Sequence, residues 1–188
     1  MTRKPVLVAL VTVATLATLV AVLHANVIQG VFGKKLSIKD AKKYRLVWTS
    51  KDATIDPTTF LAVTNGASIF YTAEATPSRF GQAVMPAVGW VEKKGTLKYT
   101  DKAHVYGPIT AVKVKAGALS VAAKDVFIPI LNAPMATRIA LQLNSGEQSF
   151  CALFPGLQGL IKKNDPTKGV FLSINAEANS GSCAQLID

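Results

Sequence analysis

Apolar and polar residues alternate along much of this chain in short segments with a period of two. Residues 35–39 have the sequence Lys-Leu-Ser-Ile-Lys, and residues 44–50 form a second segment rich in β-forming residues, with Leu46 and Trp48 on one face. A period of two places successive side chains on opposite faces of a sheet. We therefore predict that these two segments form a hairpin around a charged turn.

Further hairpins are predicted wherever the alternation returns between turn residues. They pair residues 109–115 with 118–124 and residues 137–143 with 149–154, and a last strand covers residues 169–175. Residues 85–90 and 96–101 flank a charged turn at residues 92–95. An apolar segment at residues 27–32 is either a first strand or a tether.

Three regions give a less regular pattern. Asn65-Gly66 is typical of a hairpin turn, so we expect residues 60–63 to pair with 67–72, although a short insertion before a single strand fits as well. Residues 74–82 are expected to be irregular, and residues 157–163 to form one helical turn.

Turns recur about every 8–15 residues, and no segment after the first 25 residues keeps the 3.6-residue period of a helix. This spacing predicts an all-β fold, an antiparallel β-sandwich or barrel-like domain. Without an internal repeat or low-complexity tract, we assign residues 26–188 to one domain.

The N-terminus has the layout of an export signal. Residues 6–23 contain no charge, follow Arg3 and Lys4, and end at the polar His24-Ala25-Asn26. Residues 1–25 are therefore predicted to be a signal peptide, or alternatively an uncleaved anchor, since the apolar run lies between the usual lengths of the two. In either case residues 26–188 are expected outside the cytoplasm: secreted, periplasmic or at the cell surface.

Both cysteines of the chain, Cys151 and Cys183, lie in the exported part. In an oxidising compartment such a pair predicts one disulfide. Closing a loop of this length is worth about 3–4 kcal/mol in the chain-entropy description.

The chain carries a net charge of +10, but its basic residues are spread over strands and turns. No aromatic side chains are interleaved with a basic cluster, so we predict no nucleic-acid binding. The lysines either keep sheet edges soluble or attract anionic polysaccharide or lipid. Possible ligand-facing residues are Trp90, Tyr99, Lys113 and Lys115, with core packing as the ordinary alternative for the two aromatics.

Catalytic patterns are absent from the sequence. It contains neither the G-x-S-x-G nucleophile elbow nor an S-x-x-K motif. His104 lies in an expected loop, and Glu92 and Asp101 flank one hairpin as ordinary surface charges. We predict no catalytic residues and no cofactor.

A metal site is not predicted either. Asp52, Asp56 and Asp165 lie in expected loops, but no D-x-D-x-D run joins them, and a calcium ion needs several oxygen ligands. Solvation of these loops is the ordinary explanation for the three carboxylates.

Several landmarks occur together and in order along the chain. They are residues 33–40, residues 45–52, Asp56-Pro57, Asn65-Gly66-Ala67, Met85-Pro86-Ala87, Gly89-Trp90, residues 97–101 and residues 151–154. The set resembles an uncharacterised exported β-domain that recurs in secreted proteins of environmental bacteria, often at a C-terminus. The resemblance covers nearly all of residues 33–183. It implies a fold and an exported setting but no activity, because none is established for that family. The large partner domain usual in that family is missing here, which leaves open whether the chain acts alone or assembles.

The sequence therefore favours a non-enzymatic exported structural or adhesive module of the cell envelope or extracellular space. Strand addition at exposed sheet edges offers a route to homo-oligomers, with residues 27–32 as a candidate donor strand. The alternative is a binding domain for anionic glycans or lipids. A hydrolase that uses His104 is the third hypothesis.

Overall fold

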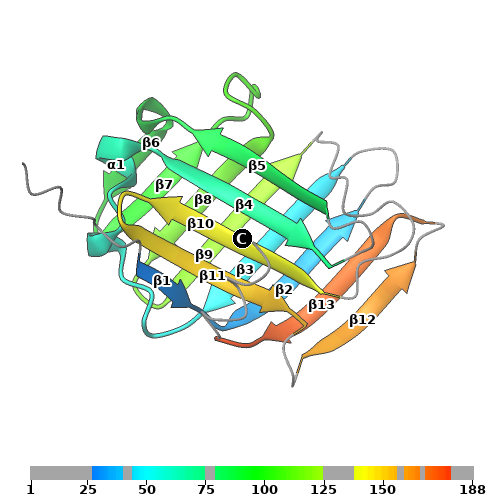
Figure 1. The fold of residues 1–188 in the computed structure, drawn as a ribbon. Helices are drawn as coiled ribbons and strands as arrows, with labels where there is room; N and C mark the ends of the chain where they lie inside the picture. The colour runs from blue at the N-terminus through cyan, green and yellow to red at the C-terminus, as the bar shows by residue number, and fades with distance from the viewer. Residues whose placement is uncertain are drawn as a thin grey trace, which may run out of the picture.

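The computed structural model describes residues 27–39, 44–74, 79–124, 138–155, 159–165 and 168–178. They form two β-sheets packed face to face, with only three short helical segments (Figure 1). This arrangement confirms the predicted all-β sandwich. The predicted signal or anchor lies outside the described residues, and among those that are described no helix is long and apolar enough to cross a membrane.

The larger sheet has eight strands, each antiparallel to its neighbours. In spatial order they are β12 (Leu160–Asp165), β13 (Val170–Ala176), β2 (Gly33–Lys39), β3 (Arg45–Lys51), β9 (Ala118–Lys124), β8 (Ile109–Lys115), β7 (Thr96–Thr100) and β6 (Trp90–Lys93). The predicted hairpins β2–β3 and β8–β9 are both present.

The smaller sheet has five strands and crosses in front of the first in Figure 1. Its order is β1 (Val27–Gly30), β11 (Gln148–Phe154), β10 (Ile139–Ser145), β4 (Ala67–Ala73) and β5 (Arg79–Met85). The predicted hairpin β10–β11 is confirmed, and residues 27–30 form a strand. β1 runs parallel to β11, so the antiparallel prediction fails for this one pair.

One continuous core fills the space between the sheets, and it is built from alternate residues of the strands other than the edge strands β1 and β12. Leu46 and Trp48 lie on the same buried face of β3, as their spacing predicts. From the opposite sheet, Phe150 and Phe154 of β11 are fully buried. Each such side chain contributes about 1.5–3 kcal/mol through removal of apolar surface from water.

The sheets approach each other closely where the chain passes from β1 to β2. A Cβ atom at Gly33 would lie 2.3 Å from Cζ of Phe154 and 2.5 Å from Cβ of Ala176, so only glycine fits. After β13, Glu177 forms an isolated bridge with Leu153 of the other sheet. Both ends of the described chain therefore join the two sheets at this corner.

The segment before β4 is helical, so the prediction of a strand at residues 60–63 is wrong. Asp56 caps the 3-10 helix η1 (Pro57–Thr59), and the helix α1 (Ala62–Asn65) follows. Gly66, with φ of 71°, ends α1 and donates its N–H to the carbonyl of Ala62. Asn-Gly thus serves as a helix end, because positive φ is required there as well as in a hairpin turn.

Two more local predictions are wrong. Residues expected to be irregular include strand β5, because Ala83 and Met85 bury their side chains in the core. The expected helical turn is instead strand β12, which pairs with β13. A second 3-10 helix, η2 (Ala87–Gly89), leads directly into β6.

Candidate functional site

The outer face of the eight-stranded sheet is densely basic. In six of its eight strands, β2, β3, β9, β8, β7 and β6, alternate residues point away from the core, and none of these outward residues is acidic. We define the basic face as the Lys and Arg residues at these positions: Lys35, Lys39, Arg45, Lys51, Lys93, Lys98, Lys113, Lys115 and Lys124.

Like charges lie directly opposite each other on neighbouring strands of this face. Lys98 of β7 is opposite Lys113 of β8, and Arg45 of β3 lies between Lys39 of β2 and Lys124 of β9. Directly opposed like charges destabilise a sheet. Neither Lys98 nor Lys113 forms an ion pair with any described residue. The fold therefore carries a cost here that an external anion would relieve.

Small side chains separate the two groups of cations. Ala118, Ser120 and Ala122 of β9 and Ala111 of β8 occupy outward positions in the middle of the face. The long lysine side chains on both sides therefore extend further from the sheet than the small side chains between them. An extended anionic polymer or a flat anionic surface has room to contact several ammonium groups at once.

The structure separates the four residues predicted to face a ligand. Lys113 and Lys115 are exposed on the basic face, whereas Trp90 and Tyr99 are buried, with 3% and 1% of their surface exposed. The rings of Trp90 and Tyr99 lie 5.5 Å apart in the core. For these two aromatics the prediction is wrong, because they share the inward face with Leu97.

The surroundings of Tyr99 agree with a core position. Burial raises the pKa of Tyr99 to about 12, with smaller contributions from the charge of Asp101 and from Tyr106. In β7, Leu97 and Tyr99 are buried and Lys98 between them is exposed, so the alternation in the sequence indicates which residues face the core and which face solvent. Sequence reasoning missed Lys98 as a member of the basic face.

Glu92 and Asp101 do not form a carboxylate pair. Glu92 lies opposite Leu97 near the β6–β7 turn, whereas Asp101 follows the far end of β7. Asp101 is buried and accepts hydrogen bonds from the backbone N–H groups of Val105 and Tyr106, at 2.9 and 2.8 Å. Both oxygens of Asp101 thus organise the loop that contains His104.

Asp52 and Asp56 lie in loops as expected, whereas Asp165 ends strand β12, so its prediction as a loop residue is wrong. Backbone N–H groups are partners of all three carboxylates. Asp52 accepts hydrogen bonds from the N–H groups of Phe32 and Thr54, Asp56 from the N–H of Thr58, and Asp165 from the N–H of Lys168. No group of three or more His, Cys, Asp or Glu side chains suited to a metal ion exists in the described part of the chain.

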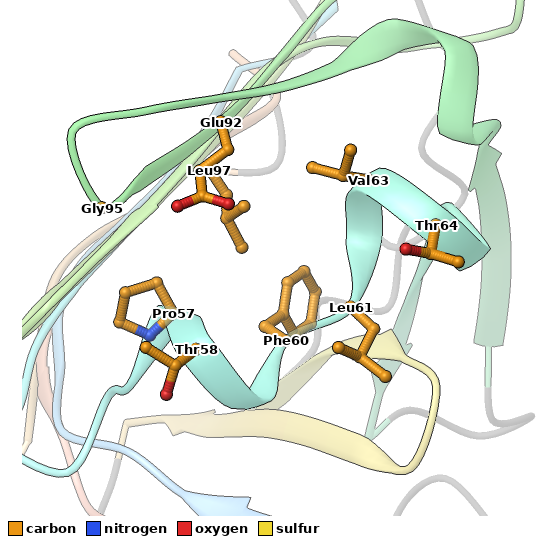
Figure 2. Close-up of a pocket in the computed structure, with 9 residues that line it drawn as sticks. All are labelled: Pro57, Thr58, Phe60, Leu61, Val63, Thr64, Glu92, Gly95 and Leu97. Carbon is orange, nitrogen blue, oxygen red and sulfur yellow. The ribbon is translucent and has the colours of Figure 1, made fainter.

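A small pocket of about 280 Å³ opens at one end of the sandwich, between η1, α1 and the β6–β7 turn (Figure 2). Its wall is mixed: apolar side chains lie beside polar surface, and among the described lining residues Glu92 is the charged one. Its lining residues are Pro57, Thr58, Phe60, Leu61, Val63, Thr64, Glu92, Gly95 and Leu97. Thr58 and Thr64 supply hydroxyls, but no His, Lys or Cys lines the pocket to activate one of them. The pocket therefore provides no catalytic constellation.

Cys151 is fully buried on the outer side of the five-stranded sheet, in a small cluster with Ala140, Leu153 and Ile28. Cys183 lies outside the described residues, so the disulfide stays a prediction.

Comparison of the chain with protein-family models, curated proteins and solved structures finds no match. The resemblance to an exported β-domain thus stays a prediction.

Proposed function

We propose that this protein is a non-enzymatic exported adhesive module that binds anionic polysaccharide or an anionic lipid surface through its basic face. One observation supports this proposal above all others: Lys98 and Lys113 are directly opposed, and no acidic residue occupies an outward position on the six strands that carry the basic face. Asp165 lies on the same side of the sheet but on edge strand β12, in line with Val170 and Lys39. The outward residues of β11, β10, β4 and β5, on the other side of the sandwich, include no charge. Among the outward strand residues of the two sheets, charge is therefore confined to the eight-stranded sheet.

The chemistry of the basic face suits a repetitive ligand. Lysine ammonium groups act as strongly hydrated point charges and lack the planar fork with which arginine selects one carboxylate or phosphate. Near an anionic membrane each such charge contributes about 1 kcal/mol, and the attraction decays within a Debye length. Binding is therefore expected to require several lysines together and to weaken steeply with salt.

The cellular setting is part of the proposal and depends on the sequence. The charge-free residues 6–23 after Arg3 and Lys4 support export, where acidic glycans and lipid head groups are the anions that a basic surface meets. Self-assembly through a donated strand at residues 27–32 receives less support, because Val27–Gly30 already pairs with β11 within the same molecule.

Charge reversal on the basic face tests the proposal. We expect the Lys98→Glu/Lys113→Glu variant to lose at least about tenfold in affinity for a sulfated polysaccharide at low salt, because two cations become anions within the array. Retention on the immobilised polysaccharide and pelleting with phosphatidylglycerol vesicles measure the two ligand classes separately.

The matched control is Lys102→Glu/Lys162→Glu, which changes the net charge equally at exposed positions outside the basic face. It should keep most of the binding. Equal losses in the two variants would show that total charge, rather than this face, attracts the anion. Absence of wild-type binding to both ligands at low salt would refute the proposal.

A further inference from the structure

The described strands leave four sheet edges, and three of them carry features that discourage pairing with another chain. β6 is four residues long and contains Glu92 and Lys93, and β1 is also four residues long. β12 contains Lys162 and Lys163 and has a register shift against β13. Short length, charge and bulges are the usual protections of an edge strand.

β5 has none of these protections. It is seven residues long, has no proline and no charged residue after Arg79, and keeps an unbroken register with β4. Phe80 and Val84 are outward-facing and remain 82% and 58% exposed, and Gln82 lies between them on the same face. A long, flat, apolar edge of this kind is a template for strand addition.

The inner side of β5 is firmly held. Ala83 and Met85 are buried in the core, and the Tyr71 ring covers Gly81, where an added Cβ would lie 2.2 Å from the ring. β5 therefore presents its free edge as part of a packed sheet.

The sequence of β5 is complementary to itself when a second copy runs antiparallel. Directly opposed residues in a sheet share a face, so a two-fold axis must lie between the two strands, midway between two copies of the same residue. An axis at Gln82 places Phe80 opposite Val84 of the second copy and pairs the whole strand. Two apolar cross-strand pairs result, and no like charges are opposed.

We propose that β5 is a homodimerisation edge, at which two copies of this chain pair antiparallel about Gln82 and join their five-stranded sheets into one. A second copy is the favoured occupant because this single register satisfies both exposed apolar side chains symmetrically. The contact is one strand per copy and hence smaller than the roughly 1,600 Å² of a standard interface. Association is therefore weak and depends on concentration.

The symmetry has a consequence that rests on the proposed function. A two-fold axis perpendicular to the joined sheet keeps equivalent faces on one side, so both basic faces point the same way. A dimer would then contact an anionic surface with two basic faces, and its avidity would exceed the affinity of one copy. The pairing itself does not depend on any ligand.

Sedimentation velocity over about a thousandfold range of concentration tests the pairing without ligand. The wild type should shift from monomer to dimer, and Val84→Lys should reduce the association constant at least about tenfold. Val91→Lys is the matched control: Val91 is also 58% exposed and lies on edge strand β6. A monomeric wild type, or equal weakening by both substitutions, would overturn the proposal.

Cysteine cross-linking tests the register. Gln82→Cys places two thiols in directly opposed positions, within the 4.4–6.8 Å Cα separation that a disulfide allows. It should form covalent dimers on mild oxidation, whereas Val84→Cys, opposed by Phe80 instead of itself, should not. Cross-linking of Val84→Cys without Gln82→Cys would overturn the register. The Lys98→Glu/Lys113→Glu variant should still dimerise, so failure of anion binding and failure of pairing are separable.

Discussion

Asp101 accepts backbone hydrogen bonds from Val105 and Tyr106 in the loop between β7 and β8. Burial acts to raise the pKa of this carboxyl group. The hydrogen bonds and the nearby His104 act in the other direction and leave the pKa of Asp101 below its ordinary value of 3.8. The charged form of Asp101 is therefore favoured in the folded state.

A carboxyl group with a depressed folded-state pKa stabilises the fold above its unfolded pKa, and this stabilisation is lost as pH falls through the folded pKa. We expect Asp101→Asn to lower the urea midpoint at pH 7, because the amide brings no charge to the two N–H donors. The difference from wild type should shrink below about pH 4. Urea unfolding at several pH values measures this, and a difference that persists unchanged in acid would contradict the assignment.

At the same scale, the sequence predicted part of the candidate site. Lys113 and Lys115 were placed correctly at the surface, because they alternate with valines in a clear strand. Trp90 and Tyr99 were misplaced, because an aromatic ring suits either a core or a sugar-binding surface. Only the pairing of Trp90 with Tyr99, and hence their common inward face, decides between the two.

At the scale of elements, hairpins such as β2–β3 were predictable because both strands and their turn are close in sequence. α1 was missed because Asn65-Gly66 requires the same backbone conformation in a hairpin turn and at a helix end. β5 was missed because its contacts come from β4 and the core, and the glycine in it weakens the local signal.

The crossing from β1 to β2 offers a direct test of packing. Gly33→Ala should destabilise the fold by about 1–3 kcal/mol, because its methyl group would overlap the Phe154 ring. Chemical denaturation of Gly33→Ala, Phe154→Leu and the double variant measures the coupling. We expect the loss in free energy of unfolding of the double variant to be smaller than the sum of the two single losses, because a smaller leucine side chain in place of Phe154 leaves room for the added methyl group. Additive losses would argue against this contact.

At the scale of the whole molecule, the order of the strands within the two sheets and the parallel pair β1–β11 could not be predicted from the sequence. Val27 pairs with Gln148, and such distant partners leave no local pattern. The bridge between Glu177 and Leu153 brings the chain end to the sheet that holds Cys151. From Glu177, Cys183 is only six residues along the chain, and this proximity supports the proposed disulfide.

Cys183→Ser tests that disulfide. We expect it to lower the free energy of unfolding by about 3–4 kcal/mol, because the unfolded chain would regain the freedom of the closed loop. Intact mass under non-reducing conditions should show the wild type lighter by two hydrogens than after reduction. Reduction that changes neither mass nor stability would exclude the bond.

Because Lys98 and Lys113 are directly opposed, salt is expected to have two opposite effects on this protein: it weakens anion binding and stabilises the fold. Counterions that shield the two ammonium groups from each other also shield them from any polyanion outside. A salt concentration that weakens binding to a polyanion would, by the same screening, raise the free energy of unfolding, because the two ammonium groups repel each other less. If the basic face binds a polyanion as proposed, salt would therefore release the protein without unfolding it, and the released protein would bind again at low salt.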